Sequence, residues 1–457
     1  MDYDLLVLGS GSAAFSAAIE GRSLGASVAM AERGTLGGTC VDVGCVPSKA
    51  LLAAAEVAAQ ARSHPFAGIE TALGHVDLAR LVDQKNQLVA DLRQAKYADV
   101  AAAHGIDLLQ GNASFLDERA VAVDGRHLAV RAVVVATGAE PAVPHISGLR
   151  GVDYLTSTTA MELHSLPRRL VVVGAGFVGA EQAQLFAGLG SQVYLAGPLI
   201  PAAEPELASL LDDALRAAGV ERCGTKAVAV AQTADAIRVQ CEDGKTATGD
   251  RLLVATGRRP RTAHLNAGRA GIELDERGHV KVDSALRTTN PHVFAAGDVA
   301  TGPQFVYVAA TMGRLAARNA LTGSAGEVDY TGLPHVAFTS PQLAWSGLTE
   351  AEARQRGHAV DTRTLGLDQV PRAIVNRDVR GAIKLVAEAG SHRLLGAHVL
   401  ADHGGELLYG ATIAIKAGWT VEQLADTWAP YLTMNEGLKL AAQSFGTNIG
   451  ELSCCAG

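Results

Sequence analysis

Short apolar runs that end at glycine-rich turns dominate the first two thirds of the chain. The run at 5–8 ends at Gly9, and the run at 170–173 ends at Gly174. After each turn, a stretch of helical spacing leads to a second apolar run. Apolar runs of about four to eight residues bounded by turns are typical of buried strands. Each segment therefore predicts a strand, a tight turn, a helix and a second strand.

These two segments are copies of one unit, because residues 3–33 recur without a gap in the second third of the chain. The first glycine of each turn, Gly9 or Gly174, permits the tight turn. The second, Gly11 or Gly176, lets the backbone approach a pyrophosphate at a helix N-terminus. One such turn alone is a weak signal and can be a packing turn. Two in register predict two dinucleotide-binding units of the Rossmann type.

Three later strands end in short polar phrases. The apolar runs 133–136 and 252–255 are followed by Thr-Gly, at Gly138 and Gly257, and a further strand ends in Gly-Asp at Asp298. A carboxylate at that place can accept hydrogen bonds from sugar hydroxyls, although Gly-Asp also occurs in ordinary turns. After two nucleotide units, the first interpretation is favoured.

The order of the elements predicts an α/β fold with three domains, the number that a length of 457 residues favours. Residues 1–147 hold the first nucleotide unit, and residues 148–266 hold the second. Residues 267–332 return to the first domain, because the Gly-Asp phrase needs the first nucleotide. In residues 333–457, strand-like runs precede helical runs, which is typical of an α+β domain.

Charge and composition exclude several classes of function. The net charge of −8 argues against a nucleic-acid binder and against a polybasic membrane-surface protein. No apolar run approaches the roughly 20 residues that span a bilayer, and the sequence begins without a basic and apolar leader. We therefore expect a cytoplasmic protein with neither membrane insertion nor nucleic acid as a partner.

Two of the six cysteines, Cys40 and Cys45, lie at the start of a predicted helix. Pro47 fits the first turn of this helix, which continues to about Arg62. A helix N-terminus lowers the pKa of a nearby thiol. The alternatives are two buried free thiols or half of a zinc site, and the second lacks a nearby His or Cys to complete it. The pair is interpreted as a redox centre.

The other four cysteines differ in their setting. Cys454 and Cys455 are adjacent in the C-terminal tail, where packing is a poor explanation because chain ends are usually mobile. Cys223 and Cys241 stand alone, in or beside strand-like stretches of the second unit. We expect these two to be buried thiols without a chemical role.

The segment 37–49, the two glycine-rich turns and the Thr-Gly and Gly-Asp phrases together resemble the pyridine nucleotide–disulfide oxidoreductases over essentially the whole chain. The resemblance implies FAD in the first domain, NAD(P)H in the second, and a homodimer formed through the C-terminal domain. It also implies that Cys40 exchanges with substrate and that Cys45 lies against the flavin.

Individual roles follow from the same resemblance. Lys49 would lie near the flavin N5, paired with Glu181. Glu32 would bind the adenosine ribose, and Asp298 would bind the ribityl or pyrophosphate part. The remaining residues implied for FAD are Gly9, Gly11, Gly38, Thr39, Thr137 and Gly138, and those implied for the pyridine nucleotide are Gly174, Gly176, Gly179 and Gly257.

The C-terminal domain departs from the members that reduce organic disulfides. Those members carry a His-Pro-Thr-x-x-Glu phrase whose histidine protonates the leaving thiol, whereas this chain has Tyr431 at that place and no histidine after His403. Tyrosine, with a pKa near 10, is a poor proton shuttle at pH 7 but can be a weak oxygen ligand. Tyr431, Tyr97 and the cysteines of the tail resemble the members that reduce Hg(II).

That resemblance implies reduction of Hg(II) to Hg(0) with NADPH, by way of FAD and the cysteine pair. Hg(II) is soft and selects thiolates. Cys454 and Cys455 would therefore take it from thiol complexes and pass it to Cys40 and Cys45 of the other subunit, with the two tyrosines assisting. The alternatives are a thioredoxin-reductase-like disulfide reductase with a Cys-Cys shuttle, and a metal-sequestering protein that has lost the flavin.

Three further features bear on this interpretation. Gly197 stands at the position that corresponds to Glu32 of the first unit. Because this position has no carboxylate to repel a 2′-phosphate, it favours NADPH. However, residues 196–198 include no arginine to bind that phosphate. Asp42 replaces the usual Asn beside the thiols. Hg(II)-reducing members often carry an N-terminal metal-binding domain with its own cysteine pair, and this chain is expected to be either a core enzyme or a truncated form of a longer one.

Overall fold

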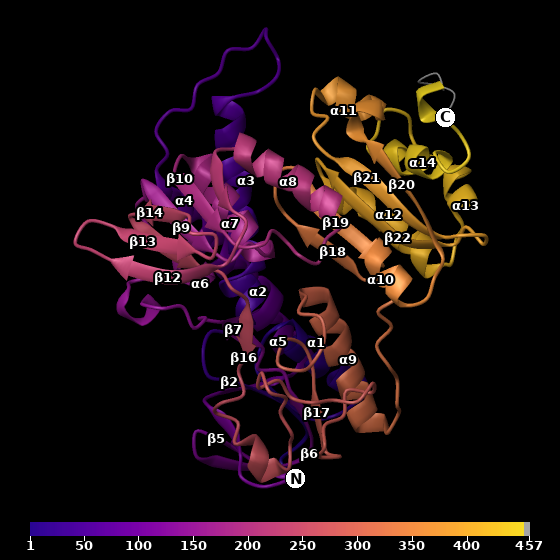
Figure 1. Cartoon of the computed structure of the whole chain (residues 1–457). Helices are drawn as coiled ribbons and strands as arrows, with labels where there is room; N and C mark the ends of the chain where they lie inside the picture. Colours follow the sequence, from indigo (N-terminus) through magenta and orange to yellow (C-terminus); the bar gives the residue numbers. More distant parts are fainter. Residues whose placement is uncertain (452–457) are drawn as a thin grey trace.

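The computed structural model describes residues 1–451, which form three lobes (Figure 1). A seven-stranded sheet is the core of the lobe at the bottom of Figure 1, in the order β3-β2-β1-β6-β5-β4, and β17 pairs in parallel with β6. The strands are β1 (Tyr3–Leu8), β2 (Val28–Glu32), β3 (Asp107–Gln110), β4 (Ala113–Phe115), β5 (Ala120–Val123), β6 (Arg126–Val135) and β17 (Val293–Ala295).

The chain leaves this first lobe and returns to it. Helix α1 (Ser12–Ser23) packs against α9 (Val306–Thr322), which follows β17. The two backbones approach so closely that a Cβ at Gly313 would lie 2.0 Å from Ala13 O. Strand β17 thus completes a sheet that began some 290 residues earlier, and α9 covers α1. Together they bring the Gly-Asp sequence after β17 to the first glycine-rich turn.

A parallel five-stranded sheet, in the order β11-β10-β9-β15-β8, is the core of the second lobe, and an antiparallel sheet, β12-β13-β14, lies beside it. The antiparallel pair β7-β16 links this lobe to the first. The elements are β7 (Ala139–Pro141), η2 (Leu149–Gly151), β8 (Leu155–Thr156), α6 (Ser157–Ala160), β9 (Arg169–Val173), α7 (Phe177–Leu189), β10 (Gln192–Ala196), α8 (Pro205–Ala217), β11 (Val220–Cys223), β12 (Ala227–Gln232), β13 (Ile237–Cys241), β14 (Thr246–Gly249), β15 (Arg251–Val254) and β16 (Arg258–Pro260). After β16 the chain returns to the first lobe, where η3 (Ala267–Ala270) packs against β4.

Helix α3 joins the first two lobes. It begins at Cys45, ends at Arg62 and packs on α7, where a Cβ at Gly188 would lie 3.1 Å from Ala55 O. A helical insertion precedes β3, and a single π-helical turn, η1, interrupts it. The elements are α2 (Gly38–Asp42), α3 (Cys45–Arg62), α4 (Leu78–Arg93), η1 (Gln94–Ala98) and α5 (Asp99–His104).

The third lobe is an antiparallel sheet in the order β18-β19-β22-β21-β20. Helix α12 packs against β19 and β22, whereas α14 packs against β20 and β21. The predicted α/β fold with an α+β C-terminal domain is confirmed. The elements are β18 (Pro334–Ala337), β19 (Gln342–Gly347), α10 (Glu350–Gln355), β20 (Val360–Gly366), η4 (Leu367–Gln369), α11 (Pro371–Asn376), β21 (Ala382–Glu388), β22 (Leu394–Ala401), α12 (Gly404–Lys416), α13 (Val421–Ala425), α14 (Asn435–Gln443) and η5 (Ile449–Glu451).

One buried cation ties the second lobe to the third. Lys384 Nζ, on β21, lies 2.9 Å from Glu204 Oε2, 2.9 Å from Glu350 Oε2 and 2.5 Å from Glu206 Oε1. Glu204 and Glu206 lie at the start of α8, and Glu350 begins α10. Burial disfavours the charged lysine, but hydrogen bonds to the three carboxylates outweigh it and raise its pKa.

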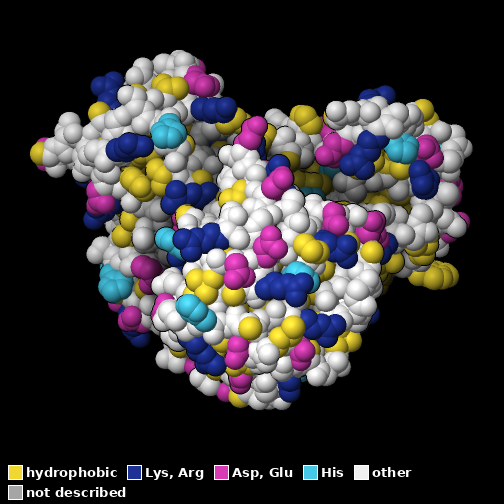
Figure 2. Space-filling view, turned by 90° about the horizontal axis from the view of Figure 1, so that it is seen from below, with side chains coloured by type: hydrophobic (Ala, Val, Ile, Leu, Met, Phe, Trp, Pro, Cys, Tyr) yellow, Lys and Arg dark blue, Asp and Glu magenta, His cyan; other side chains and the backbone are white. Residues whose placement is uncertain are grey.

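Charges on the face seen in Figure 2 are mixed. Lysine and arginine side chains alternate there with aspartate and glutamate, so neither sign forms a continuous surface among the described residues in this view. In the described part of the chain, every helix is too short or too polar to cross a membrane.

Candidate active site

The two cysteines of the predicted redox centre lie on consecutive helices. Cys40 belongs to α2, and Cys45 is the first residue of α3. The turn between them depends on Gly44, because a Cβ there would lie 2.7 Å from Thr39 O. Both cysteines are free thiols in the structure, and a hydrogen bond joins their sulfur atoms. Four intervening residues are thus folded so that the sulfurs meet.

The hydrogen bond makes the two thiols chemically unequal. Donation from Cys40 lowers the pKa of Cys45 to about 7, with help from the Lys49 ammonium, although burial and Glu181 oppose the shift. The same hydrogen bond, together with burial, raises the pKa of Cys40. The N-terminal end of α3 favours negative charge on the sulfur of its first residue. In the reduced pair, Cys45 is therefore the thiolate and Cys40 keeps its proton.

All three lobes meet at Lys49, one turn further along α3. Its Nζ lies 2.7 Å from Glu181 Oε2, on the buried part of α7, and 4.4 Å from the ring centroid of Phe338. The backbone N–H of Phe338 donates to Glu181 Oε1 at 2.9 Å. The structure thus brings together the Lys49–Glu181 pair that the family resemblance implied. Phe338 was not predicted, because no motif surrounds it and only the fold brings it to Lys49.

Tyr97 faces the cysteine pair from the π-helical turn. Its ring packs edge-on against Phe15, with the centroids 4.9 Å apart. Burial raises the pKa of the phenol, and the neighbouring Cys40 and Asp42 raise it further. Tyr97 is thus a neutral phenol near the thiols, as the predicted weak oxygen ligand requires. Single π-turns within α-helices frequently mark functional sites, but the apolar pattern of this segment gave no sign of one.

Asp42 is the last residue of α2, and its side chain faces α4 of the helical insertion. Its Oδ1 is buried 3.5 Å from Arg93 Nη1 but without a hydrogen bond in the described part of the chain. Burial raises the pKa of Asp42 to about 6, and the charge of Arg93 opposes the shift. Arg93 is a second residue that sequence reasoning missed, because it lies 51 positions away on α4. It partly neutralises the charge that replaces the family's usual Asn.

The first glycine-rich turn forms an open cradle at the start of α1. A Cβ at Gly9 would lie 2.4 Å from Ala136 O, and one at Gly38 would lie 2.6 Å from Gly11 Cα. Backbone therefore packs on backbone here, which leaves the N–H groups of α1 accessible to a phosphate. At the end of β2, Glu32 accepts hydrogen bonds from Ser10 Oγ and Gly34 N, both at 2.7 Å. These residues fit a dinucleotide.

The Gly-Asp phrase closes the same cradle. Burial raises the pKa of Asp298, whereas Arg258, with Nε 3.6 Å from Asp298 Oδ2, lowers it. Arg258 Nε is buried without a hydrogen-bond acceptor in the described residues, as expected where a polar ligand group completes the site. Thr137 Oγ1 donates to Arg261 O at 2.8 Å, and Gly138 has a φ of +68°. The donors and acceptors present therefore suit a flavin dinucleotide, and Arg258 is a further member.

The second glycine-rich turn repeats the geometry of the first. A Cβ at Gly174 would lie 2.4 Å from Ala255 O, and one at Gly179 would lie 1.8 Å from Gly174 O. By contrast, the space around the Cβ positions of Gly176 and Gly257 is open, with no non-neighbouring atom of residues 1–451 within 4 Å. Gly176 precedes the first residue of α7, so a pyrophosphate can approach the backbone there. This cradle fits a pyridine nucleotide.

Tyr431 does not join the cysteine pair of its own chain. It lies between α13 and α14 with 49% of its surface exposed, and these helices lie on the far side of the third lobe from α2 and α3 (Figure 1). Nearby, Trp428 is 96% exposed, which is unusual for so large an apolar side chain. Cys454 and Cys455 lie outside the described residues.

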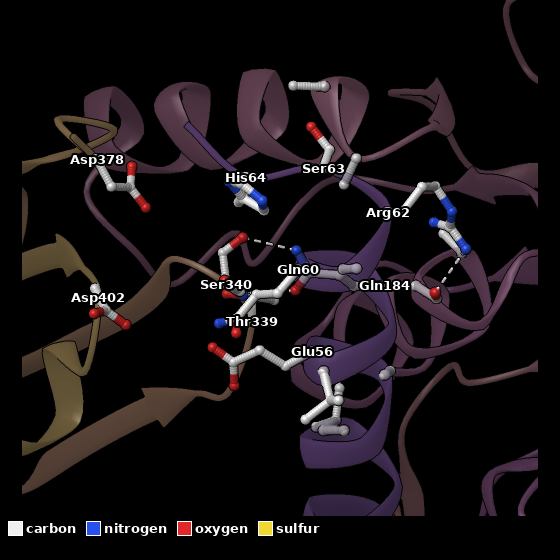
Figure 3. Close-up of a pocket in the computed structure, with 18 of the residues that line it drawn as sticks. Glu56, Gln60, Arg62, Ser63, His64, Gln184, Thr339, Ser340, Asp378 and Asp402 are labelled. Atoms are coloured by element: carbon white, nitrogen blue, oxygen red, sulfur yellow. Dashed lines mark hydrogen bonds between the residues drawn. The ribbon is translucent and has the colours of Figure 1, made fainter. Parts of the chain in front are cut away.

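A groove of about 1650 Å³ opens beside α3, and Lys49 and Phe338 lie at one end of it. Figure 3 shows Glu56, Gln60 and His64 facing it from α3 and the loop that follows. Asp378 and Asp402 face it from the third lobe. Lys49 thus lies on the wall of this groove as well as in its ion pair with Glu181.

A thiol–thiolate pair between two dinucleotide cradles has the parts that a flavin-dependent disulfide oxidoreductase needs. The chain matches the family model "Pyridine nucleotide-disulphide oxidoreductase" over residues 3–313 and the dimerisation domain of that family over residues 333–442. The chain belongs to this family. Membership implies a flavin and a pyridine nucleotide as cofactors, and the dimerisation domain supports a homodimer.

Several curated proteins similar to this chain are named mercuric reductase. A mercuric reductase from Streptomyces lividans is 51% identical over 468 residues, which cover 100% of this chain and 98% of that protein. One from Staphylococcus aureus is 46% identical over 463 residues, which cover 100% of this chain and 85% of that protein. Among solved structures, the Cu(II) complex of the HOCl-induced flavoprotein disulfide reductase RclA from Escherichia coli has a TM-score of 0.87 at 29% identity, covering 98% of this chain and 100% of that one.

Proposed function

We propose that this protein reduces Hg(II) to Hg(0) with NADPH, using FAD and the Cys40–Cys45 pair. The observation that carries the proposal is the thiol pair itself. Cys45 is a thiolate near neutral pH, and Cys40 needs to lose only one proton for both sulfurs to bind a soft ion. The extent of identity to the mercuric reductases supports the choice of metal.

The reaction needs two electrons and no protonated product thiol. NADPH and Hg(II) yield NADP⁺, a proton and Hg(0). The histidine that protonates the leaving thiol in the disulfide-reducing members is therefore not needed for this reaction. A flavin held at the first cradle, by Glu32, Asp298 and the turn at Gly11, supplies two-electron transfer between nicotinamide and metal. Lys49 and Glu181 position one another at the junction of the lobes. Tyr97 offers a neutral oxygen to the ion held by the thiolates.

We further propose that each site is shared between two subunits. Tyr431 lies far from the cysteine pair of its own chain, and the exposed Trp428 beside it suits burial against a partner. In this arrangement, Tyr431 and the tail cysteines Cys454 and Cys455 serve the partner's site. The tail takes Hg(II) from thiol complexes by ligand exchange and delivers it to the pair.

The domain roles complete the proposal. Residues 1–147 and 267–332 bind FAD, residues 148–266 bind NADPH, and residues 333–457 form the dimer and carry the tail. The reaction takes place in the cytoplasm. NADPH is favoured over NADH because Gly197 offers no carboxylate to repel a 2′-phosphate.

The decisive assay is Hg(II)-dependent NADPH oxidation in excess monothiol, with glutathione disulfide and thioredoxin as rival substrates. We expect metal-dependent turnover that Cys40→Ala or Cys45→Ala abolishes, and little turnover of either disulfide. Tyr431→Phe should slow metal turnover, whereas Tyr409→Phe, at a still more exposed tyrosine of the same domain, should not. Fast disulfide reduction without metal would instead favour the thioredoxin-reductase-like alternative.

A mixing experiment tests the shared site. A Cys40→Ala/Cys45→Ala protein and a Cys454→Ala/Cys455→Ala protein are combined under conditions that exchange subunits, with Hg(II) held by a competing thiol. Each parent should be poor, and the heterodimer should regain one intact site. Activity that requires all four cysteines on one chain would contradict the arrangement.

A further inference from the structure

A second group of thiols lies in the NADPH-binding lobe, away from Cys40 and Cys45. Cys223 ends β11, Cys241 ends β13, and Asp243 follows in the next turn. One ligand atom of each, two sulfurs and a carboxylate oxygen, lies within 4.8 Å of the other two. We propose that these three residues form a separate binding site for a thiophilic metal ion such as Hg(II). This inference does not rest on the proposed function.

The fold, rather than the sequence spacing, brings the two cysteines together. They belong to different sheets, since β11 is an edge strand of the parallel sheet and β13 is the middle strand of the antiparallel one. Thr225 links the two sides, because its Oγ1 lies 3.3 Å from Cys223 Sγ and accepts from Asp243 N at 3.4 Å. The cysteines are 0% and 1% exposed, as predicted, but polar atoms line one side of the pair.

Without a metal ion, the Cys241 sulfur carries a proton. Burial and the hydrogen bond to Cys223 raise the pKa of Cys241 to about 12. The Cys223 thiol donates to Asp243 Oδ1 at 3.5 Å. Binding of a divalent ion breaks both S–H bonds, forms two S–metal bonds and releases two protons, with no transfer of electrons. Asp243 can accept the first proton and hand it to solvent, because it is exposed.

The donor set selects a soft ion of low coordination number. Two collinear metal–sulfur bonds, each about the 2.3 Å of a zinc–thiolate bond, span about 4.6 Å, and the two sulfurs lie within 4.8 Å of each other. A closed zinc site needs four ligands, and this cluster offers three. Two thiolates satisfy a soft ion such as Hg(II) without further ligands. Asp243, paired with Lys245 at 3.1 Å, marks the side from which an ion enters.

The site adjoins the predicted adenosine end of the NADPH cradle. Gly197 N donates to Cys223 O at 2.9 Å, and Arg222 Nη2 donates to Gly197 O at 3.1 Å. Gly197 packs against the glycine-rich turn, since its Cβ would lie 3.1 Å from Ala175 N. A bound ion that pulls β11 toward β13 would therefore act on nucleotide affinity as well as on stability.

The test uses the full chain with Cys40, Cys45, Cys454 and Cys455 replaced by alanine, so that only the proposed site can hold metal through cysteine. The protein is loaded with HgCl₂ and dialysed against a monothiol, and bound mercury is then measured. We expect close to one Hg(II) per chain, a thiolate-to-mercury absorption band and a raised Tm. The matched control adds Cys223→Ala and Cys241→Ala, and it should retain less than about a tenth as much.

Two outcomes would overturn the proposal. One is equal mercury retention by the two proteins, and the other is loss of both thiols to a disulfide before any metal binds. Should the four-alanine chain fail to fold, the wild-type chain and its Cys223→Ala/Cys241→Ala variant decide the matter. Wild type should then hold one more Hg(II) per chain, and equal stoichiometry refutes the site.

Discussion

The inequality of the two active-site thiols can be tested by removing the hydrogen-bond donor. In Cys40→Ala, Cys45 loses the largest influence that holds its pKa near 7 rather than at its ordinary value of 9.0. The full difference of two units corresponds to about 3 kcal/mol. Protein surrounds much of Cys45, but solvent still reaches it in the single chain and screens part of this, so we expect a rise of about one unit or more. The thiolate fraction at pH 7 then falls from about one half to about one tenth.

The assay is the pH dependence of Cys45 alkylation, followed by peptide mass mapping in chains whose tail cysteines are alanine. Cys40→Ser is the matched control, because its hydroxyl can still donate to the Cys45 sulfur. We expect its pKa to lie below that of Cys40→Ala. If Cys45 still titrates near 7 in Cys40→Ala, then the helix N-terminus and Lys49 alone stabilise the thiolate, and the hydrogen-bond argument is wrong.

Three further predictions concern the surrounding groups. Lys49→Met leaves the Glu181 carboxylate buried without its ion-pair partner and should lower the free energy of unfolding by about 2 kcal/mol. The expected loss is smaller than for a fully buried ion pair, because Lys49 is one-third exposed. Adding Glu181→Gln should restore part of this loss in denaturant titrations. Asp42→Asn should raise the Tm near pH 8 but not near pH 4. The pKa of Asp42 is raised to about 6 in the folded protein, so its ionisation opposes folding as the pH rises through that value. Equal shifts of the Tm at both pH values would refute this. Gly176→Ala places a methyl group in the open space of the second cradle and should raise the KM for NADPH about tenfold without changing flavin content. Gly268→Ala, at an equally open position, should change neither.

Local patterns predicted most of the fold. The repeated apolar run, glycine turn and helix depend on neighbouring residues, so β1, α1, β9 and α7 could be found from the sequence. Pro47 marked the start of α3 for the same reason. The return of β17 to the first sheet was inferred because one phrase needed a nucleotide held by another segment.

Residues recruited from distant elements could not be predicted. Arg93, Arg258 and Phe338 lie in no motif, and each reaches the site only after helices, strands and lobes have packed. The closeness of Cys223 and Cys241 is of the same kind, since it depends on how two separate sheets are placed. Such positions need long-range contacts, which no periodicity along the chain encodes.

The interrupted first lobe has a consequence for how the protein forms on the ribosome. Its sheet lacks β17, and α1 lacks its partner α9, until more than 300 residues have been made. The second lobe occupies one continuous stretch and can fold while synthesis continues, because domains generally fold as units in order of emergence. During this time the first lobe stays incomplete, and the face of α1 that α9 later covers is exposed. Asp298 arrives with the same late segment, so we expect flavin uptake to follow release of nearly the whole chain, and early truncation to yield a colourless, aggregation-prone product.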